Sequence, residues 1–231
     1  MLNELTNSPL FGIALTLGIY VLAQMLYRRI GSIFFNPVAL SIAGIIVFLL
    51  LFRIPYENYA TGGRFILFLL GPSVIALGAP LYSRRQEILC RKGPILLGVL
   101  AGALTSILSA SGIAWLLGGS REVILSMAPK STTTPIAIGI VEKIGGISPL
   151  TAAIVVLTGC LGAICGPEFC RLLGIREPAA MGLAVGTAAH GIGTARMLEV
   201  DRLGGAVAGL AIGLNGLITA FILPLLFVFF R

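Results

Sequence analysis

Long apolar runs separated by short polar stretches make up most of this chain of 231 residues. A helix needs about 20 apolar residues to cross a membrane, and several runs are close to that length. Proline opens most of them and is tolerated in a first helical turn, because its missing N–H has no partner there. The pattern therefore predicts spanning helices over Pro9–Tyr27, Pro37–Phe52, Pro94–Leu117, Pro149–Gly166 and Ala206–Phe230.

Other apolar segments contain glycine or proline in their middle: Phe65–Tyr82, Glu122–Ile144 and Pro178–Met197. Lipid cannot satisfy the backbone groups of an unwound segment, so such breaks must be shielded by protein or line a water-filled cavity. We therefore expect broken helices or re-entrant loops at these places. The predicted fold class is an all-α polytopic membrane protein with about 6–8 membrane segments, in two weakly repeated halves with the broken or re-entrant helices at the core.

Glycine spacing suggests an internal repeat. The matching set is Gly71, Gly78 and Gly98 against Gly186, Gly193 and Gly213. Corresponding interrupted segments in two halves of a membrane protein point to a transporter site, whereas shared composition also produces such coincidences in a chain with 30 glycines. We expect one membrane domain over residues 1–231, with candidate repeats over 9–118 and 122–230.

Composition supports a membrane protein. The chain is 57% hydrophobic and 11% charged, whereas soluble domains carry about 25% charged residues. The net charge is +7, but the basic residues stand singly or in pairs at the ends of apolar segments, as at Arg28–Arg29 and Arg84–Arg85. This is typical of topology signals in membrane loops. Since no basic patch is interleaved with aromatic residues, we expect no nucleic-acid partner.

Two polar stretches stand out from this apolar background: Pro129–Gly146, which reads PKSTTTPIAIGIVEKIGG, and Gly186–Glu199, which reads GTAAHGIGTARMLE. Charged and hydroxyl groups are expensive at membrane depth, and they persist mainly where they line a cavity, a pathway or a partner surface. These stretches are therefore the candidate functional site.

The first stretch joins a lysine to a run of hydroxyl residues: Lys130, Ser131, Thr132, Thr133 and Thr134. Ser and Thr favour helix N-caps and proline favours the first turn, so with Pro135 the pattern predicts a half-helix from near Thr134 to Lys143. Free N–H groups at its start, hydroxyls and an ammonium together describe an anion site. The alternative is that Lys130 snorkels to the membrane interface while the threonines only cap the helix.

The second stretch contains the only histidine of the chain, His190, together with Thr187, Thr194 and Arg196. An unperturbed imidazole has a pKa of about 6.5, which makes His190 a candidate proton carrier. The alternative is a neutral, hydrogen-bonding histidine inside a helix bundle. Arg196 has three interpretations: it reaches an anionic ligand, pairs with Glu199 or marks the membrane interface.

Metal and catalytic sites are not expected. One histidine cannot form a histidine-only metal site, and the four cysteines contain no CxxC pair, which disfavours a zinc site and a disulfide framework. No Ser-His-Asp set and no buried carboxylate pair suggests catalysis. We predict no enzyme activity, no metal and no cofactor.

The two polar stretches resemble the signature regions of LrgB/CidB-type membrane proteins. That family includes bacterial proteins described as antiholin-like or as murein hydrolase export regulators, and the C-terminal half of the plastidal glycolate/glycerate translocator. The resemblance covers nearly the whole chain. Two positions depart from it: Thr132 stands where the family commonly has valine, and Ala189 stands where it commonly has serine.

The resemblance implies a multi-pass protein of the cell inner (cytoplasmic) membrane. It implies a small LrgA/CidA-like membrane protein as partner, in a homo- or hetero-oligomer within the lipid bilayer. It also implies small organic acid anions as cargo, among them glycolate, glycerate and pyruvate.

These observations predict a secondary transporter, or a transporter subunit, for small 2-hydroxy or 2-oxo monocarboxylates. In this hypothesis the stretch from Lys130 to Thr134 binds the carboxylate and hydroxyl groups, and Thr187, His190 and Thr194 face it across a cavity. Arg196 is a further candidate ligand, and His190 couples a proton. The alternative function is an antiholin-like regulator of murein hydrolase export and cell lysis, acting with a holin-like partner.

Overall fold

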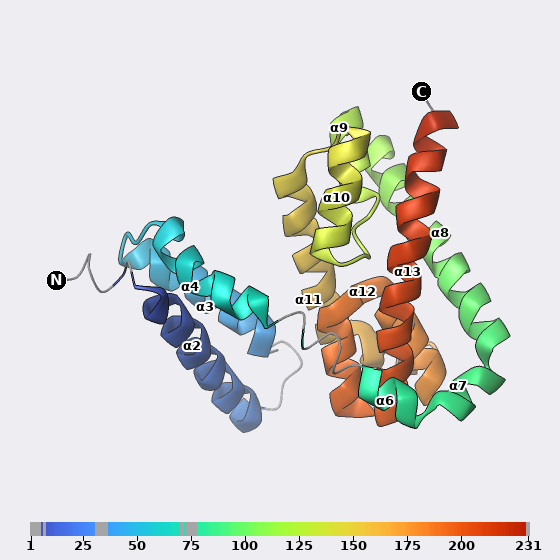
Figure 1. Cartoon of the computed structure of the whole chain (residues 1–231), viewed down its shortest axis with the longest axis horizontal. Helices are drawn as coiled ribbons and strands as arrows, with labels where there is room; N and C mark the ends of the chain where they lie inside the picture. The colour runs from blue at the N-terminus through green and yellow to red at the C-terminus, as the bar shows by residue number, and fades with distance from the viewer. Residues whose placement is uncertain (1–5, 7, 31–36, 70–71, 73–77, 230–231) are drawn as a thin grey trace. The chain divides into compact units, whose positions relative to one another are not determined.

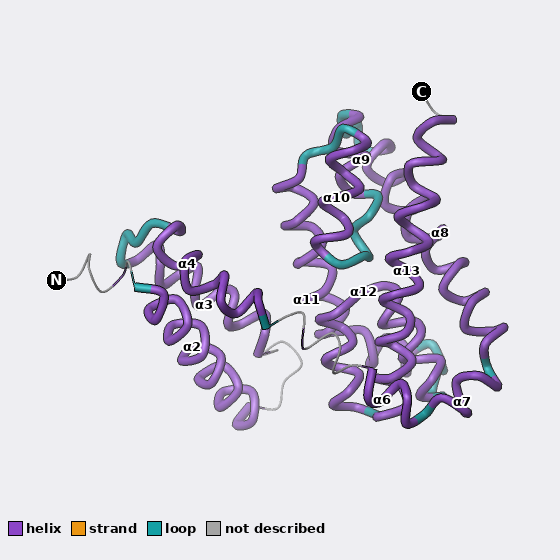
Figure 2. Tube along the Cα trace, viewed as in Figure 1, coloured by secondary structure: helices purple, strands orange, loops and turns teal. Residues whose placement is uncertain are grey.

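The computed structural model describes the chain except for residues 1–5, 7, 31–36, 70–71, 73–77 and 230–231. The described residues form helices joined by turns and contain no strand, as Figure 2 shows. The predicted all-α fold class is confirmed. Contacts divide the chain into two compact units, Met1–Leu77 and Gly78–Arg231. The expected single domain over 1–231, with repeats over 9–118 and 122–230, stays a prediction.

The first unit contains α2 (Pro9–Ile30), α3 (Pro37–Leu51) and α4 (Tyr56–Phe68). Helices α2 and α4 approach closely at Gly12, where an added Cβ would meet the carbonyl oxygen of Tyr59. The hydroxyl oxygens of Thr16 and Tyr59 share a hydrogen bond of 3.0 Å in the same contact. Small residues at the contact are the usual way in which helices pack in lipid.

The second unit contains α6 (Gly78–Ser83), α7 (Arg85–Cys90), α8 (Lys92–Leu116), α9 (Arg121–Met127), α10 (Thr134–Ile144), α11 (Ser148–Leu172), α12 (Pro178–Val200) and α13 (Arg202–Phe229). Within the described chain, α2, α8, α11 and the part of α13 up to Leu226 are long and apolar enough to cross a membrane. Helix α3 is apolar but has only 15 residues. All of these helices coincide with predicted spans.

Helices α9 and α10 form a hairpin, called hairpin 1 below, through the turn 128–133. The Ser126 hydroxyl accepts a hydrogen bond of 2.7 Å from the Ile147 backbone N–H. Thr151 Oγ1 donates a hydrogen bond of 3.0 Å to the Ser126 carbonyl oxygen. Residues 126 and 147 would lie about 32 Å apart in one straight helix, so their contact means that α10 turns back past α9.

Helix α12 is also a hairpin, called hairpin 2 below. Ala189 (φ −125°, ψ 15°) and His190 (φ 42°, ψ −137°) have non-helical dihedral angles that break it into two arms. Pro178 and Val200 would lie about 33 Å apart in a straight helix, but they line the same hollow. The chain therefore reverses at Ala189 and His190, and the two ends of α12 lie side by side.

The two hairpins start at opposite ends of α8. Hairpin 2 starts beside the first residues of α8, where Arg91 forms an ion pair with Glu177; the hydrogen bond and charge of Glu177 raise the pKa of the Arg91 guanidinium. Hairpin 1 starts beside the end of α8, where Trp115 and Arg121 line one hollow. Figure 1 shows α9 and α10 at one end of the long helices and α12 at the other. In a membrane crossed by α8, the hairpins therefore enter from opposite faces.

Helices α8 and α11, each with its following hairpin, form an inverted repeat. Both helices have 25 residues, and both are followed by a glycine of positive φ, Gly118 (76°) and Gly174 (79°). Each hairpin is then capped by a side chain that accepts a backbone hydrogen bond, Ser120 in one case and Glu177 in the other. Helix α8 starts at Lys92, beside Glu177, and α11 ends at Leu172, shortly before Glu177, so the two helices run in opposite directions. Inverted repeats of this kind build many secondary transporters.

The predicted breaks in Glu122–Ile144 and Pro178–Met197 are confirmed, and both segments are hairpins in which the chain reverses. The third predicted break, in Phe65–Tyr82, falls largely on residues 70–71 and 73–77, which lie outside the described part of the chain. The inverted repeat of α8 and α11 with their hairpins spans 92–144 and 148–200, and the longer repeat expected from glycine spacing remains a separate prediction.

Candidate functional site

A groove with a volume of about 540 Å³ lies between α8, the tip of hairpin 1 and the first arm of hairpin 2. Its hydroxyl and charged lining residues are Thr105, Ser106, Lys130, Ser131 and Thr187. Both polar stretches of the sequence therefore contribute to one hollow. Thr105 and Ser106 of α8 were not among the site residues predicted from the sequence, and they add two hydroxyl residues to the lining of the groove.

Glycines on α8 allow hairpin 2 to lie close beside it. A Cβ added to Gly98 would stand 2.6 Å from Leu183 Cδ2, and one added to Gly102 would stand 2.8 Å from Thr187 Cγ2. A side chain at either position would therefore push on the groove wall. Such small faces are typical of helix contacts in membranes, and here they set the width of the groove.

Lys130 lies partly buried at the tip of hairpin 1. Its Nζ donates a hydrogen bond of 3.2 Å to Ser131 Oγ, which in turn shares a hydrogen bond of 2.7 Å with Ser106 Oγ. Among the residues that the structure describes, no carboxylate lies within ion-pairing distance of Lys130. An ammonium has three donors, so Lys130 keeps donors and an unbalanced charge for an anion in the groove.

The half-helix predicted after Lys130 is confirmed. Helix α10 begins at Thr134 and ends at Ile144, with Pro135 in its first turn and Thr133 in extended conformation at the N-cap (φ −70°, ψ 148°). The Thr133 side chain makes no capping hydrogen bond. Backbone conformation and the proline therefore start this helix without the side-chain cap that the sequence suggested.

The hydroxyl residues that follow Lys130 do not all face the groove. Ser131 lines it, whereas Thr132 is buried and donates its Oγ1 proton to the Pro129 carbonyl oxygen at 2.9 Å. Thr133 and Thr134 are partly exposed at the start of α10. The structure thus places Lys130 and Ser131 in the groove and gives Thr132 a structural hydrogen bond within the turn.

His190 lies at the break of hairpin 2 and faces α11. Its Nε2 is 2.8 Å from the carbonyl oxygen of Val155, and a Cβ added to Gly159 of α11 would stand 2.6 Å from its Cε1. It is buried and does not line the groove that contains Lys130. Of the three residues expected to face Lys130 across a cavity, Thr187 does so, and His190 points to another helix.

Thr194 and Arg196 also lie outside the groove. Thr194 is buried, and its Oγ1 has no hydrogen-bond partner among the described residues. Arg196 pairs with Glu199 at 3.0 Å and with Glu168 at 3.5 Å. Pairing with Glu199 was one of the interpretations of Arg196 from the sequence.

Asn215 of α13 joins the two hairpins. Its Nδ2 donates hydrogen bonds to the carbonyl oxygens of Ser131, at 2.9 Å, and Thr187, at 3.1 Å. The side chain is 1% exposed. The available signal in the sequence was a single carboxamide within a long apolar run, and such a buried polar group requires partners.

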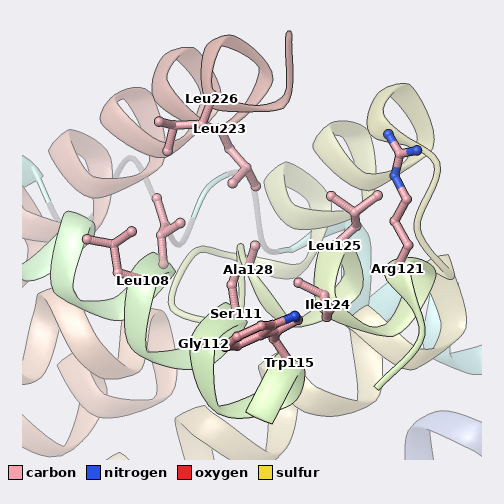
Figure 3. Close-up of a pocket in the computed structure, with 11 residues that line it drawn as sticks. Leu108, Ser111, Gly112, Trp115, Arg121, Ile124, Leu125, Ala128, Leu223 and Leu226 are labelled. Atoms are coloured by element: carbon pink, nitrogen blue, oxygen red, sulfur yellow. The ribbon is translucent and has the colours of Figure 1, made fainter. Parts of the chain in front are cut away.

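A second hollow, of about 600 Å³, lies between α8, α9 and α13. Figure 3 shows its apolar walls, with Trp115 on α8 and the Arg121 guanidinium at one edge. Its lining includes Ile107, which follows Ser106 directly in the sequence, and Ala128, which lies two residues before Lys130. Arg121, the charged residue of this lining, is exposed, whereas Lys130 in the groove is partly buried.

Comparison with known proteins identifies the family of this chain. A relative from Bacillus subtilis (strain 168), the uncharacterized protein YxaC, is 37% identical over 213 residues, which cover 92% of this chain and 93% of the relative. No solved structure matches the chain. The model of the LrgB-like family matches residues 16–229, so this protein belongs to the LrgB-like family of membrane proteins.

Proposed function

We propose that this protein is a secondary transporter, or the transporting subunit of one, for small 2-hydroxy or 2-oxo monocarboxylates such as glycolate, glycerate or pyruvate. The observation that carries the proposal is the partly buried ammonium of Lys130, which has a hydroxyl partner but no carboxylate partner among the described residues. A charge at membrane depth without a counter-charge is unfavourable. A bound carboxylate would balance it.

The groove also fits the size and charge of such a cargo. Its volume of about 540 Å³ lies within the range of about 300–1,000 Å³ that is common for small-molecule sites. Of the described residues that line it, Lys130 alone is charged, which favours a monoanion over a dicarboxylate. Ser131 and Ser106 offer hydroxyl groups that can bind the 2-hydroxy or 2-oxo group of the acid. The Thr187 hydroxyl oxygen is buried and has no hydrogen-bond partner among the described residues.

The architecture supports transport as the activity. Binding sites of many secondary transporters lie near the bilayer midplane at the interface of inverted repeats, and are formed by interrupted helices. Here the groove lies where the tips of two opposed hairpins meet beside α8. Rocking of one hairpin and its long helix against the other would expose the same groove to either face.

The proposal extends to the setting of the protein. It places the chain in the cell inner membrane, beside an LrgA/CidA-like partner. His190 remains the candidate proton carrier, although it lies against Val155 and outside the groove. In this arrangement its protonation would act on the shape of the hairpin 2 break and not by direct contact with the cargo.

The test is uptake of radiolabelled glycolate and pyruvate by proteoliposomes that contain the purified protein. Lys130→Ala should abolish most of the uptake. Lys143→Ala is the matched control, because this exposed lysine lies in the same sequence stretch, at the far end of α10. Equal uptake by the wild type and Lys130→Ala contradicts the proposal. If the wild type neither transports nor binds any of these acids, the antiholin-like regulator becomes the better account.

A further inference from the structure

Asn215 occupies a special place in α13. The helix is apolar around it, and the side chain is almost completely buried. Both Asn215 hydrogen bonds run to main-chain carbonyl oxygens, so the orientation of its carboxamide is settled by its partners: the NH₂ group must face them. Thr219 Oγ1, one turn further along α13, donates a hydrogen bond of 3.5 Å to Asn215 Oδ1, the carbonyl oxygen of the same carboxamide.

The two carbonyl oxygens belong to the tips of opposite hairpins. Ser131 lies in the turn between α9 and α10, and Thr187 lies in the last turn before the break of hairpin 2. Turns and helix ends leave carbonyl groups short of donors within their own segment. Lipid offers no replacement, so the donors must come from neighbouring protein. Asn215 supplies one donor to each tip.

Ser131 and Thr187 also line the groove, from its two sides. The Asn215 carboxamide therefore fixes the distance between the carbonyl groups of Ser131 and Thr187, which belong to the two hairpins on either side of the groove. Lys130 and Ser106 are tied to the same point, since both share hydrogen bonds with Ser131 Oγ. A change at Asn215 must shift these groups relative to Thr187.

We infer that Asn215 is a positioning residue for cargo binding: its carboxamide holds the tips of the two hairpins at the spacing at which Lys130, Ser131 and Thr187 can contact one carboxylate-bearing molecule. The inference rests on the proposed function and assigns Asn215 no contact with the cargo. In the conformation that the structure shows, Asn215 also links the two hairpins of the inverted repeat to each other. Asn215 bonds one backbone carbonyl of each hairpin, so movement of either hairpin relative to α13 during transport breaks one of these hydrogen bonds.

The test measures the dissociation constant of radiolabelled pyruvate and glycolate with purified full-length protein in detergent. Asn215→Leu keeps the branching of the side chain at Cγ and removes both donors. We expect it to raise the dissociation constant at least tenfold. Thr151→Val is the control for a lost buried hydrogen bond outside the groove, because Thr151 Oγ1 donates to the Ser126 carbonyl oxygen at the far end of hairpin 1. That variant should lower the thermal midpoint and leave the dissociation constant within twofold of the wild type.

A double-mutant cycle separates positioning from general stability. If Asn215 acts by placing Lys130, the effects of Asn215→Leu and Lys130→Ala on the dissociation constant must be less than additive, because coupled residues fail additivity. Fully additive effects, or an unchanged dissociation constant in Asn215→Leu, overturn the inference. Should Asn215→Leu not fold, Asn215→Gln keeps the donors one methylene further out. A dissociation constant within twofold of the wild type in that variant also overturns it.

The outcomes distinguish this inference from the function on which it rests. If the wild type binds the acids and Lys130→Ala does not, while Asn215→Leu binds as the wild type does, the inference fails and the proposed function stands. If the wild type binds none of the acids, both fail.

Discussion

Ser106 of α8 and Ser131 of hairpin 1 share a hydrogen bond, with their Oγ atoms 2.7 Å apart. The pair ties α8, which is long and apolar enough to cross a membrane, to the tip of hairpin 1 beside the groove. Ser131 Oγ also accepts from Lys130 Nζ, so the Ser131 hydroxyl orients the only charged group of the described groove lining. In the proposed function, cargo binding depends on this small polar cluster of Ser106, Ser131 and Lys130.

Replacing Ser106 by alanine should weaken cargo binding moderately. The change removes one hydrogen bond, worth about 1 kcal/mol net, which corresponds to roughly a fivefold loss of affinity. Titration of the purified protein with pyruvate measures it. Ser109→Ala is a suitable comparison, since the exposed Ser109 hydroxyl bonds only its own helix, at the Ser106 carbonyl oxygen. An affinity loss as large in Ser109→Ala would count against the Ser106–Ser131 contact.

Side chains added at Gly102 should close the groove. A Cβ there would stand 2.8 Å from Thr187 Cγ2, so Gly102→Val pushes Thr187 or α8 out of place. Uptake should fall at least tenfold while the protein still inserts into the membrane. Gly112→Val tests the same change on the same helix, at a position where nothing lies within 4 Å of the added Cβ, and it should transport at close to the wild-type rate.

The contact between hairpin 2 and α13 should be the most sensitive point for stability. A Cβ on Gly182 would overlap the carbonyl oxygen of Gly204, which is backbone and cannot rotate away. Overpacking of this kind costs about 1–3 kcal/mol, so Gly182→Ala should lower the thermal midpoint of the purified protein. In Gly209→Ala, on α13 itself, the added Cβ meets nothing within 4 Å, and its midpoint should stay close to that of the wild type.

Replacing His190 by glutamine should flatten the dependence of uptake on pH. If His190 carries the coupled proton, uptake driven by an inward proton gradient depends on its imidazole, and glutamine cannot titrate. The readout is the initial rate of pyruvate uptake at several external pH values. A pH profile identical to that of the wild type would remove His190 from the coupling path and leave it as a structural partner of Val155.

Much of the secondary structure could be predicted from the sequence, because apolar length and proline position are local signals. The start of α10 at Thr134 follows from the hydroxyl run and Pro135. The broken character of Pro178–Met197 follows from its glycines, but the reversal there could not be predicted. It depends on the dihedral angles of Ala189 and His190, which are set by packing against α11 and α13.

The candidate site could be predicted only in part, because the direction of a side chain also depends on how the helices pack. Lys130, Ser131 and Thr187 meet in one groove as their polar character suggested. His190 and Arg196 are equally polar, but their directions depend on which face of a reversed helix they occupy, and they contact Val155 and Glu168 instead. Asn215 was not identified because a single carboxamide in an apolar run gives no pattern, and its importance appears only when both hairpin tips are placed beside it.

The measurement that tests the central claim most directly is equilibrium binding of radiolabelled pyruvate or glycolate to the purified protein, with Lys130→Ala beside the wild type and Lys143→Ala as control. A charge-assisted hydrogen bond from the ammonium is worth about 1.5–3 kcal/mol, so Lys130→Ala should lose roughly 10- to 150-fold in affinity. Lys143→Ala should bind as the wild type does. Equal affinities in the wild type and Lys130→Ala would show that the anion, wherever it binds, is not held by this lysine.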